Sequence, residues 1–350
     1  MSEDGYASSS AMWESALAQG RARARERGVD AQGLQRRLVY SRFLARVFAS
    51  PDSPWVLKGG TATLMRVPKG RTTNDVDLLA QARDLTAAVA DLRRLAAADL
   101  WDHFRFVPIS ERDNLGGAGQ PNVTTRRVTF DAFCGTQRAL PSFGVDVVIG
   151  SLMTATPDET VDDPIPLRGI TPPVVRLYPL VDHIADKLCA TMTTYGSGAS
   201  SRERDLVDLV VFALSQDVDG AELTFAIHAE WANRDMDGSP RFDPPAAWRS
   251  RFAPLARKTP ACTVVTFREA VELVTAFLAP PMERSAGRLR WVAAEGAWRP
   301  LPVGDTEAPV GSQNPPEPAS QADSASSIPV TRSRAVSRPV VPQHRPWLRP

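Results

Sequence analysis

A glycine pair followed, one short loop later, by two aspartates at alternate positions constrains this chain most. The glycines are Gly59 and Gly60, and the aspartates are Asp75 and Asp77, in Asn74-Asp75-Val76-Asp77-Leu78. Side chains two apart on a strand point to the same face, so Asp75 and Asp77 can hold metal ions jointly. Because glycine lacks a Cβ, the backbone at Gly59 and Gly60 can approach a phosphate closely. The pattern therefore indicates a site for a phosphate ligand bound with metal.

The composition allows a large core but does not identify a partner. The chain has 350 residues, of which 43% are hydrophobic, and 41 Lys and Arg nearly balance 40 Asp and Glu. A role in nucleic-acid binding would therefore have to rest on local patches. The run Arg21–Arg27 is a candidate patch of this kind, although such a run is more often a solvated helix face.

Cysteine usage and hydropathy predict a soluble cytoplasmic protein with no membrane contact. Cys134, Cys189 and Cys262 lie far apart, with no histidine spaced for zinc, so we expect buried reduced thiols. No apolar run reaches the length needed to span a bilayer. The polar N-terminus lacks the apolar core of a signal peptide.

Hydrophobic periodicity predicts an α/β fold in which a small mixed sheet precedes a helical C-terminal domain. We expect strands at Trp55–Leu57, Val76–Leu79, Phe104–Val107, Val123–Phe133, Val145–Ile149 and Leu289–Val292. Helices are expected up to Phe48, from Thr61, from Asp84, over Leu180–Thr194 and Arg204–Leu214, and over most of Glu222–Leu278, with loops at Asp235–Pro245 and Pro254–Pro260. Met153–Pro173, rich in Pro, Asp and Thr, should be a connecting loop.

These elements suggest four regions. They are a helical extension over 1–33, a core with the glycines and aspartates over 34–150, a mainly helical domain over 151–300, and a tail over 301–350. The Pro- and Ser-rich tail cannot bury enough apolar surface to offset the entropy of ordering it, so we expect it to be disordered.

A third carboxylate would complete a two-metal site. Asp146, in Val145-Asp146-Val147-Val148, is the candidate by position. In such sites one ion activates an attacking hydroxyl and the other stabilises the leaving group.

A second group of candidates lies on two later helices. His183 and Lys187 share the polar stripe of the helix from Leu180, where a lysine can reach a triphosphate. Asp205 and Asp208, three apart on the next helix, can face one side. A carboxylate near Lys187 could orient it, accept a proton from a hydroxyl, or form an ordinary interhelical salt bridge.

The residues around the glycines and aspartates are candidates for nucleotide binding. Thr61 directly follows the glycines. Lys58 could line the pocket or be exposed. Arg71 and Thr73 could contact phosphate or cap the strand.

In their order, these pieces resemble the AbiEii-type nucleotidyltransferase toxins of the MenT group, which have the DNA polymerase β-like fold. The resemblance covers about Leu34 to Leu214. Its pieces are Leu57-Lys58-Gly59-Gly60-Thr61, Arg71-Thr72-Thr73-Asn74-Asp75-Val76-Asp77-Leu78, Val145-Asp146-Val147-Val148, Ile184-Ala185-Asp186-Lys187-Leu188 and Arg202-Glu203-Arg204-Asp205-Leu206-Val207-Asp208-Leu209. Arg204 stands where the family usually has lysine, which replaces a point donor by a planar fork.

The resemblance implies an Mg²⁺-dependent nucleotidyltransferase with Asp75, Asp77, Lys187 and Asp208 in its active site. It would transfer a nucleoside monophosphate from an NTP to the 3′ end of tRNA, releasing pyrophosphate. The resemblance also implies a cognate antitoxin protein and a role in phage defence.

Three alternatives remain open at this point. The acceptor could be a protein or small-molecule hydroxyl, the γ-phosphate could be transferred instead, or the fold could serve as a binding module without catalysis. The preferred base is not readable, because base contacts would come from loops such as Asn114–Pro121. The sequence also leaves open the oligomeric state and how the antitoxin acts.

Overall fold

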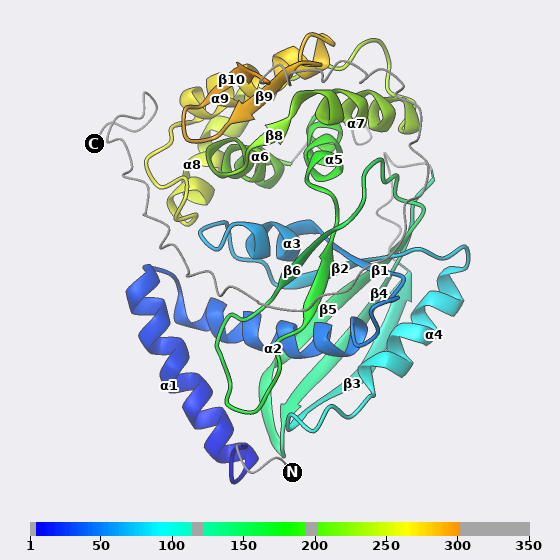
Figure 1. Ribbon diagram of the computed structural model, residues 1–350, viewed down its shortest axis with the longest axis vertical. Coiled ribbons are helices and arrows are strands. Elements are labelled where there is room, and N and C mark those ends of the chain that lie inside the picture. Colours follow the sequence, from blue (N-terminus) through cyan, green and yellow to red (C-terminus); the bar gives the residue numbers. More distant parts are fainter. Residues whose placement is uncertain (1–4, 114–121, 194–201, 302–350) are drawn as a thin grey trace, which may run out of the picture.

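The computed structural model describes residues 5–113, 122–193 and 202–301. Within these ranges the first half of the chain combines helices and a large sheet, and the second half is mainly helical (Figure 1). The elements are, in chain order, α1 (Ser9–Arg27), α2 (Ala31–Val47), β1 (Trp55–Lys58), α3 (Gly59–Arg66), β2 (Asp75–Ala80), α4 (Leu85–Ala96), β3 (Phe104–Asp113), β4 (Thr124–Cys134), β5 (Gln137–Ile149), β6 (Asp158–Val161), β7 (Val174–Leu177), α5 (Leu180–Met192), α6 (Glu203–Ser215), β8 (Val218–Asp219), α7 (Gly220–Asn233), the short 3₁₀ helix η1 (Ala246–Trp248), α8 (Arg249–Arg257), α9 (Phe267–Met282), β9 (Leu289–Val292) and β10 (Ala297–Pro300).

The large sheet has seven strands in the order β3-β4-β5-β2-β1-β7-β6. Strand β2 runs parallel to β5 and antiparallel to β1, while β1 runs parallel to β7. Both β1 and β2 are therefore interior strands, which suits their buried apolar residues. The expected α/β class, with a mixed sheet followed by a helical part, is confirmed.

The two faces of the sheet have different neighbours. One face packs against α1, α2 and α4 in a large hydrophobic cluster that includes Leu78 and Val145. Because side chains alternate along a strand, Asp77 and Asp146 point to the opposite face. That face carries a small apolar cluster of Val56, Leu79, Val148 and Tyr178.

A second hydrophobic cluster holds the C-terminal helices together. It contains residues of α5 to α9 and the buried side chains of Trp248 and Trp291. In Figure 1 these helices gather at one end of the molecule, and α3 lies between them and the strands. The first cluster extends to Leu177 and the second includes Val181. The domain boundary at 150 stays a prediction.

Several details differ from the expected elements. Helix α3 begins at Gly59 rather than at Thr61, so the glycines form its first turn. The expected loop after Met153 contains β6, an edge strand too short to show a pattern in the sequence. Pro254 lies inside α8, where a loop was expected. Burial of Phe252 and Ala256 on that helix offsets the hydrogen bond that a proline cannot donate.

The remaining expectations concern exposed and buried side chains. Arg21, Arg25 and Arg27 are exposed on α1. The three cysteines are buried and free, as expected. No helix in the described part of the chain has the length and apolarity needed to cross a membrane. The expected tail beyond residue 301, the loop Asn114–Pro121 and the expected end of the helix at Thr194 lie outside the described residues.

Candidate active site

A row of four charged residues crosses the sheet on the face opposite α2 and α4. Asp77 on β2 lies opposite Lys58 on β1 and opposite Asp146 on β5, and Asp146 lies opposite Arg127 on β4. Paired positions on neighbouring strands place their side chains on the same face. Across the strands β1, β2, β5 and β4, the register thus places a cation, two carboxylates and a second cation side by side. Asp75 projects from the same face of β2, two residues before Asp77.

Gly59 is required by the carboxylate of Asp77. Its backbone has a φ of +63°, and a Cβ at this position would lie 1.9 Å from Oδ2 of Asp77. A side chain is therefore excluded both by conformation and by space. Because α3 begins at Gly59, the N–H groups of its first turn have no partner within the helix and lie beside the aspartates, where they can bind an anion.

Two threonines position Asp75. The hydroxyl of Thr73 donates to Oδ1 of Asp75 at 2.7 Å, and the hydroxyl of Thr61 donates to its main-chain oxygen at 2.7 Å. Thr61 is 2% exposed. The hydroxyl of Thr61 thus forms a structural bond at the start of β2, and its contact with a nucleotide stays a prediction. The side chain of Asp75 is 44% exposed and remains accessible.

Burial and two neighbouring carboxylates, Asp75 and Asp146, raise the pKa of Asp77 to about 7. Lys58 and Lys187 act in the opposite direction but do not cancel this effect. Negative charges held this close in a poorly solvated place repel one another. A bound cation would relieve the repulsion, so the electrostatics of the two aspartates fit a cation site.

The third predicted carboxylate is engaged elsewhere. Arg127 donates to both oxygens of Asp146, with its Nε at 2.7 Å from Oδ1. Its terminal nitrogen also lies 3.6 Å from Oδ2 of Asp75. The prediction placed Asp146 correctly beside the pair, but its oxygens face a guanidinium. Sequence reasoning did not single out Arg127, because the register that places it opposite Asp146 cannot be read from the strand expected at Val123–Phe133.

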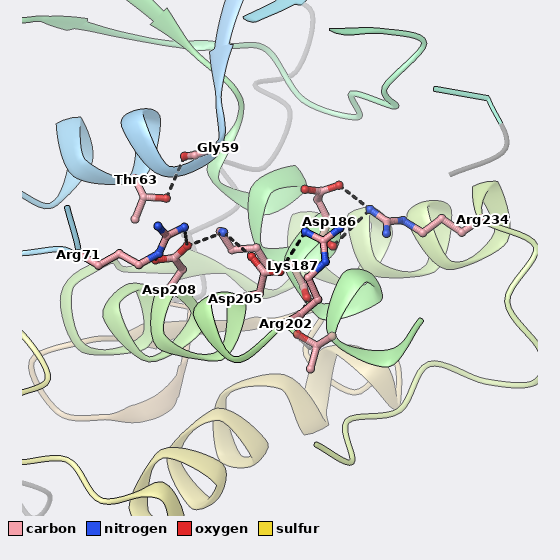
Figure 2. A network of polar contacts seen from close by, with 10 residues as sticks. Gly59, Thr63, Arg71, Asp186, Lys187, Arg202, Asp205, Asp208 and Arg234 are labelled. Carbon is pink, nitrogen blue, oxygen red and sulfur yellow. Dashed lines mark hydrogen bonds and ion pairs between the residues drawn. The ribbon is translucent and has the colours of Figure 1, made fainter. Parts of the chain in front are cut away.

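Lys187 and Asp208 form the centre of a second charged network, which Figure 2 shows from close by. Asp208 accepts two hydrogen bonds from Arg71, both at 2.9 Å, and one from Lys187 at 2.6 Å. Lys187 also donates to Asp205 at 3.0 Å. The carboxylate of Asp208 is fully buried, whereas that of Asp205 is 12% exposed. This geometry favours a role for Asp208 in orienting the two cations rather than in accepting a proton from substrate.

The pKa values of this network follow from mutual neutralisation. Burial opposes ionisation of Asp208, but Lys187 and Arg71 hold its pKa below the ordinary value. Burial likewise favours neutral Lys187, but Asp208 and Asp205 keep its pKa above the ordinary value. Lys187 therefore carries a stable positive charge at the cavity wall.

Lys58 and His183 lie deeper than their sequence positions suggested. Lys58 is 7% exposed, donates to the hydroxyl of Ser151 at 2.9 Å, and lies over the ring of Tyr178. His183 packs against the rings of Tyr178 and Phe212, and burial lowers its pKa well below the usual value. It is a neutral side chain on the floor of the site.

Most of these groups border a cavity of about 1230 Å³, whereas Thr61, Arg127 and Asp208 are not among its lining residues. Among the predicted residues, those that line it are Lys58, Gly59, Gly60, Arg71, Thr73, Asp75, Asp77, Asp146, Lys187 and Asp205. Asp186 and Arg234 line it as well, and they form an ion pair that sequence reasoning did not single out (Figure 2). The adjacent Lys187 was singled out instead, because it lies on the polar stripe of its helix, from which a lysine can reach a triphosphate.

The residues present fit a magnesium ion, with a smaller donor set than predicted. Within the described ranges no group of three or more His, Cys, Asp or Glu side chains is arranged to hold a metal. Asp75 and Asp77 nevertheless provide carboxylate oxygens at an open cavity. Mg²⁺ is commonly bound through one or two carboxylates together with substrate phosphates, so this pair is sufficient.

Comparison with known proteins agrees with the class of enzyme that this site suggests. A family model described as nucleotidyl transferase AbiEii toxin of type IV toxin–antitoxin systems matches residues 42–276. The chain therefore belongs to the AbiEii family of nucleotidyltransferase toxins, which implies an NTP substrate and an antitoxin partner. No curated protein matches the sequence.

Among solved structures, the chain is similar to MenT4, a nucleotidyltransferase toxin from Mycobacterium tuberculosis, with 19% identity and a TM-score of 0.41 over 76% of this chain and 98% of that one. It is also similar to JHP933 from Helicobacter pylori, with 12% identity and a TM-score of 0.40 over 73% of this chain and 94% of that one.

Proposed function

We propose that this protein transfers a nucleoside monophosphate from an Mg²⁺-bound NTP to a hydroxyl at the 3′ end of tRNA in the cytoplasm. The acceptor oxygen forms a bond to the α-phosphorus, the bond between the α-phosphorus and the bridging oxygen breaks, pyrophosphate leaves, and the hydroxyl proton passes to water. The observation that carries the proposal is the meeting of Asp75, Asp77 and the first turn of α3 at one wall of the cavity.

The sheet side of the cavity would bind the reacting phosphates. The N–H groups at Gly59 and Gly60 would face phosphate oxygens without obstruction from a Cβ. Asp75 and Asp77 would hold the magnesium ion, which when bound activates the hydroxyl and offsets phosphate charge. Thr73 keeps the carboxylate of Asp75 in one orientation through its 2.7 Å bond.

The helical side would stabilise the leaving group. Pyrophosphate gains negative charge as it departs, and cations already fixed in position stabilise this charge without reorganisation. An ammonium has three N–H donors, and within the described residues Asp205 and Asp208 take two of those of Lys187. The third is available for a phosphate oxygen. Arg71 lines the same cavity and bonds to Asp208 from the side opposite to Lys187.

The size and rim of the cavity support a second, polyanionic substrate. Its volume of about 1230 Å³ exceeds the roughly 300–1,000 Å³ that is common for one small ligand. Arg204, Arg251 and Lys258 line it and are exposed. These cations would meet the phosphates near an RNA terminus, and the choice of tRNA itself comes from the family.

A transfer assay tests the proposal. The purified protein is incubated with each of the four NTPs, labelled at the α-phosphate, together with total tRNA, cell lysate protein or small hydroxyl compounds. Label on tRNA, with the mass of a full nucleotide, is expected. Label confined to protein or to a small molecule would refute the tRNA acceptor, and a mass gain of one phosphate would refute nucleotidyl transfer.

Asp77→Asn supplies the control for catalysis. The variant should lose transfer, because it removes one of the two carboxylates at the metal. It should also lose the arrest of cell growth that the wild type causes when produced without its antitoxin. Equal growth arrest by both proteins would show that toxicity comes from binding rather than from catalysis.

A further inference from the structure

Arg127 occupies the place in the charged row where a three-carboxylate site would hold a cation. Its guanidinium bonds to both oxygens of Asp146 and lies 3.6 Å from Asp75. The side chain reaches this position by crossing Gly144, whose added Cβ would lie 3.1 Å from both Cδ and Nε of Arg127. The register of β4 with β5 places Arg127 directly opposite Asp146. The close contact with Gly144 and the bonds to Asp146 thus hold the guanidinium in place.

This arrangement removes Asp146 from the metal ligands. A carboxylate that accepts a bidentate pair from arginine has its two oxygens directed at that arginine. The side chain of Asp146 is 9% exposed, against 44% for Asp75. A guanidinium remains protonated at any relevant pH, and the carboxylates of Asp146, Asp75 and Asp77 stabilise its charge further. The positive charge beside Asp75 is therefore permanent.

We propose that the guanidinium of Arg127 replaces the second divalent ion, so that the loaded site holds one ion on Asp75 and Asp77. This inference rests on the proposed function and specifies its metal requirement. Arg127 acts as a positioning residue: it keeps Asp146 away from the ion and balances part of the charge on Asp75. Asp75 and Asp77 would then hold a single ion together with the substrate phosphates and water.

Counting bound Mn²⁺ in the full-length wild type tests this directly. The protein is saturated with the α,β-methylene analogue of the NTP that serves in transfer, dialysed against Mn²⁺, and the retained ions per chain are counted by electron paramagnetic resonance. One ion is expected. Two ions would overturn the inference while leaving the proposed function intact, whereas no bound ion would overturn both.

Arg127→Met extends the test, because it removes the charge but keeps much of the side chain's bulk. With Asp146 released, the count should rise from one to two. Arg126→Met is the matched control: it replaces the neighbouring arginine, which pairs with Asp113 and Glu111 instead, and should retain one ion. A count of one in Arg127→Met would show that the guanidinium does not stand in for an ion. The wild-type count decides the matter if Arg127→Met fails to fold.

Discussion

Replacing Asp208 by asparagine would remove a buried negative charge that two cations share. Its carboxylate is fully buried and accepts hydrogen bonds from Arg71, at 2.9 Å twice, and from Lys187 at 2.6 Å. Asparagine offers one acceptor oxygen and turns an N–H₂ group towards a cation. Removing one partner from a buried charge network costs about 3–5 kcal/mol, out of a total stability of roughly 5–15 kcal/mol.

Thermal unfolding followed by circular dichroism at neutral pH would measure this loss. A chain of this size loses about 2–4 °C of Tm per kcal/mol, so Asp208→Asn should lower Tm by roughly 10 °C. Asp205→Asn should cost less, about 1–2 kcal/mol, because Asp205 is partly exposed and its pairs, with Lys187 at 3.0 Å and with Arg202 at 3.7 Å, are longer than those of Asp208. A larger effect at Asp205 than at Asp208 would refute this account of the network.

The pH dependence provides a second readout. Despite burial, Lys187 and Arg71 hold the pKa of Asp208 below its ordinary value. Its contribution to stability is therefore fully present above the unfolded pKa of about 3.9. It is lost as the pH falls through the lower folded pKa. The Tm difference between wild type and Asp208→Asn should be constant from neutral pH down to about 5 and shrink below about 4.

A matched control separates stability from catalysis. Asp102 is also a buried carboxylate shared by two cations, Arg42 at 2.8 Å and Arg46 at 2.7 Å, but it lies away from the cavity. Asp102→Asn should lower Tm to a similar extent and leave the transfer rate of the folded protein within about twofold. Asp208→Asn should lower that rate about 100-fold, because the cations that meet the leaving group lose their support. Equal rates in the two variants would contradict the proposed role of the network.

Two further substitutions test the sheet side of the site. Gly59→Ala should lower the transfer rate at least about 100-fold, because the added Cβ would displace Asp77. Gly28→Ala is the control: Gly28 has a similar φ of +64° but nothing within 4 Å of an added Cβ, so this variant should lose about 1 kcal/mol of stability and no activity. Similar transfer rates in both alanine variants would refute the steric argument. Thr73→Val should raise the Mg²⁺ concentration for half-maximal transfer about tenfold by freeing the carboxylate of Asp75, and an unchanged Mg²⁺ titration would show that the hydroxyl does not orient it.

Local sequence patterns predicted those parts of the site whose geometry is set by residues close together in the sequence. The alternation of Asp75 and Asp77 follows from the period of a strand, and the position of the glycines follows from their lack of a Cβ. Helical spacing correctly placed Lys187 and Asp208 on facing helices. Their roles in catalysis stay predictions, which the transfer assays above would test.

Register and tertiary packing decided the rest. Arg127 reads as an exposed residue within β4, and it reaches the site because β4 pairs with β5 in a register that no short pattern encodes. Similarly, Asp205 and Asp208 are equivalent by helical spacing, yet α6 packs so that Asp205 lines the cavity and Asp208 is buried beneath it. Sequence reasoning favoured Asp208 as the active-site carboxylate. In the structure the two aspartates differ in burial, a difference that helical spacing does not predict.

The bond between Arg71 and Asp208 links the two sides of the active site. Arg71 belongs to the loop between α3 and β2, directly before the aspartates, while Asp208 and Lys187 belong to the C-terminal helices. A bidentate pair fixes both distance and orientation. If the helical part moved away, Lys187 would move with it, Arg71 would lose Asp208, and Asp208 would keep Lys187 but lose one of its two cations. The cost of breaking this pair therefore opposes separation of the carboxylates of β2 from Lys187 on α5.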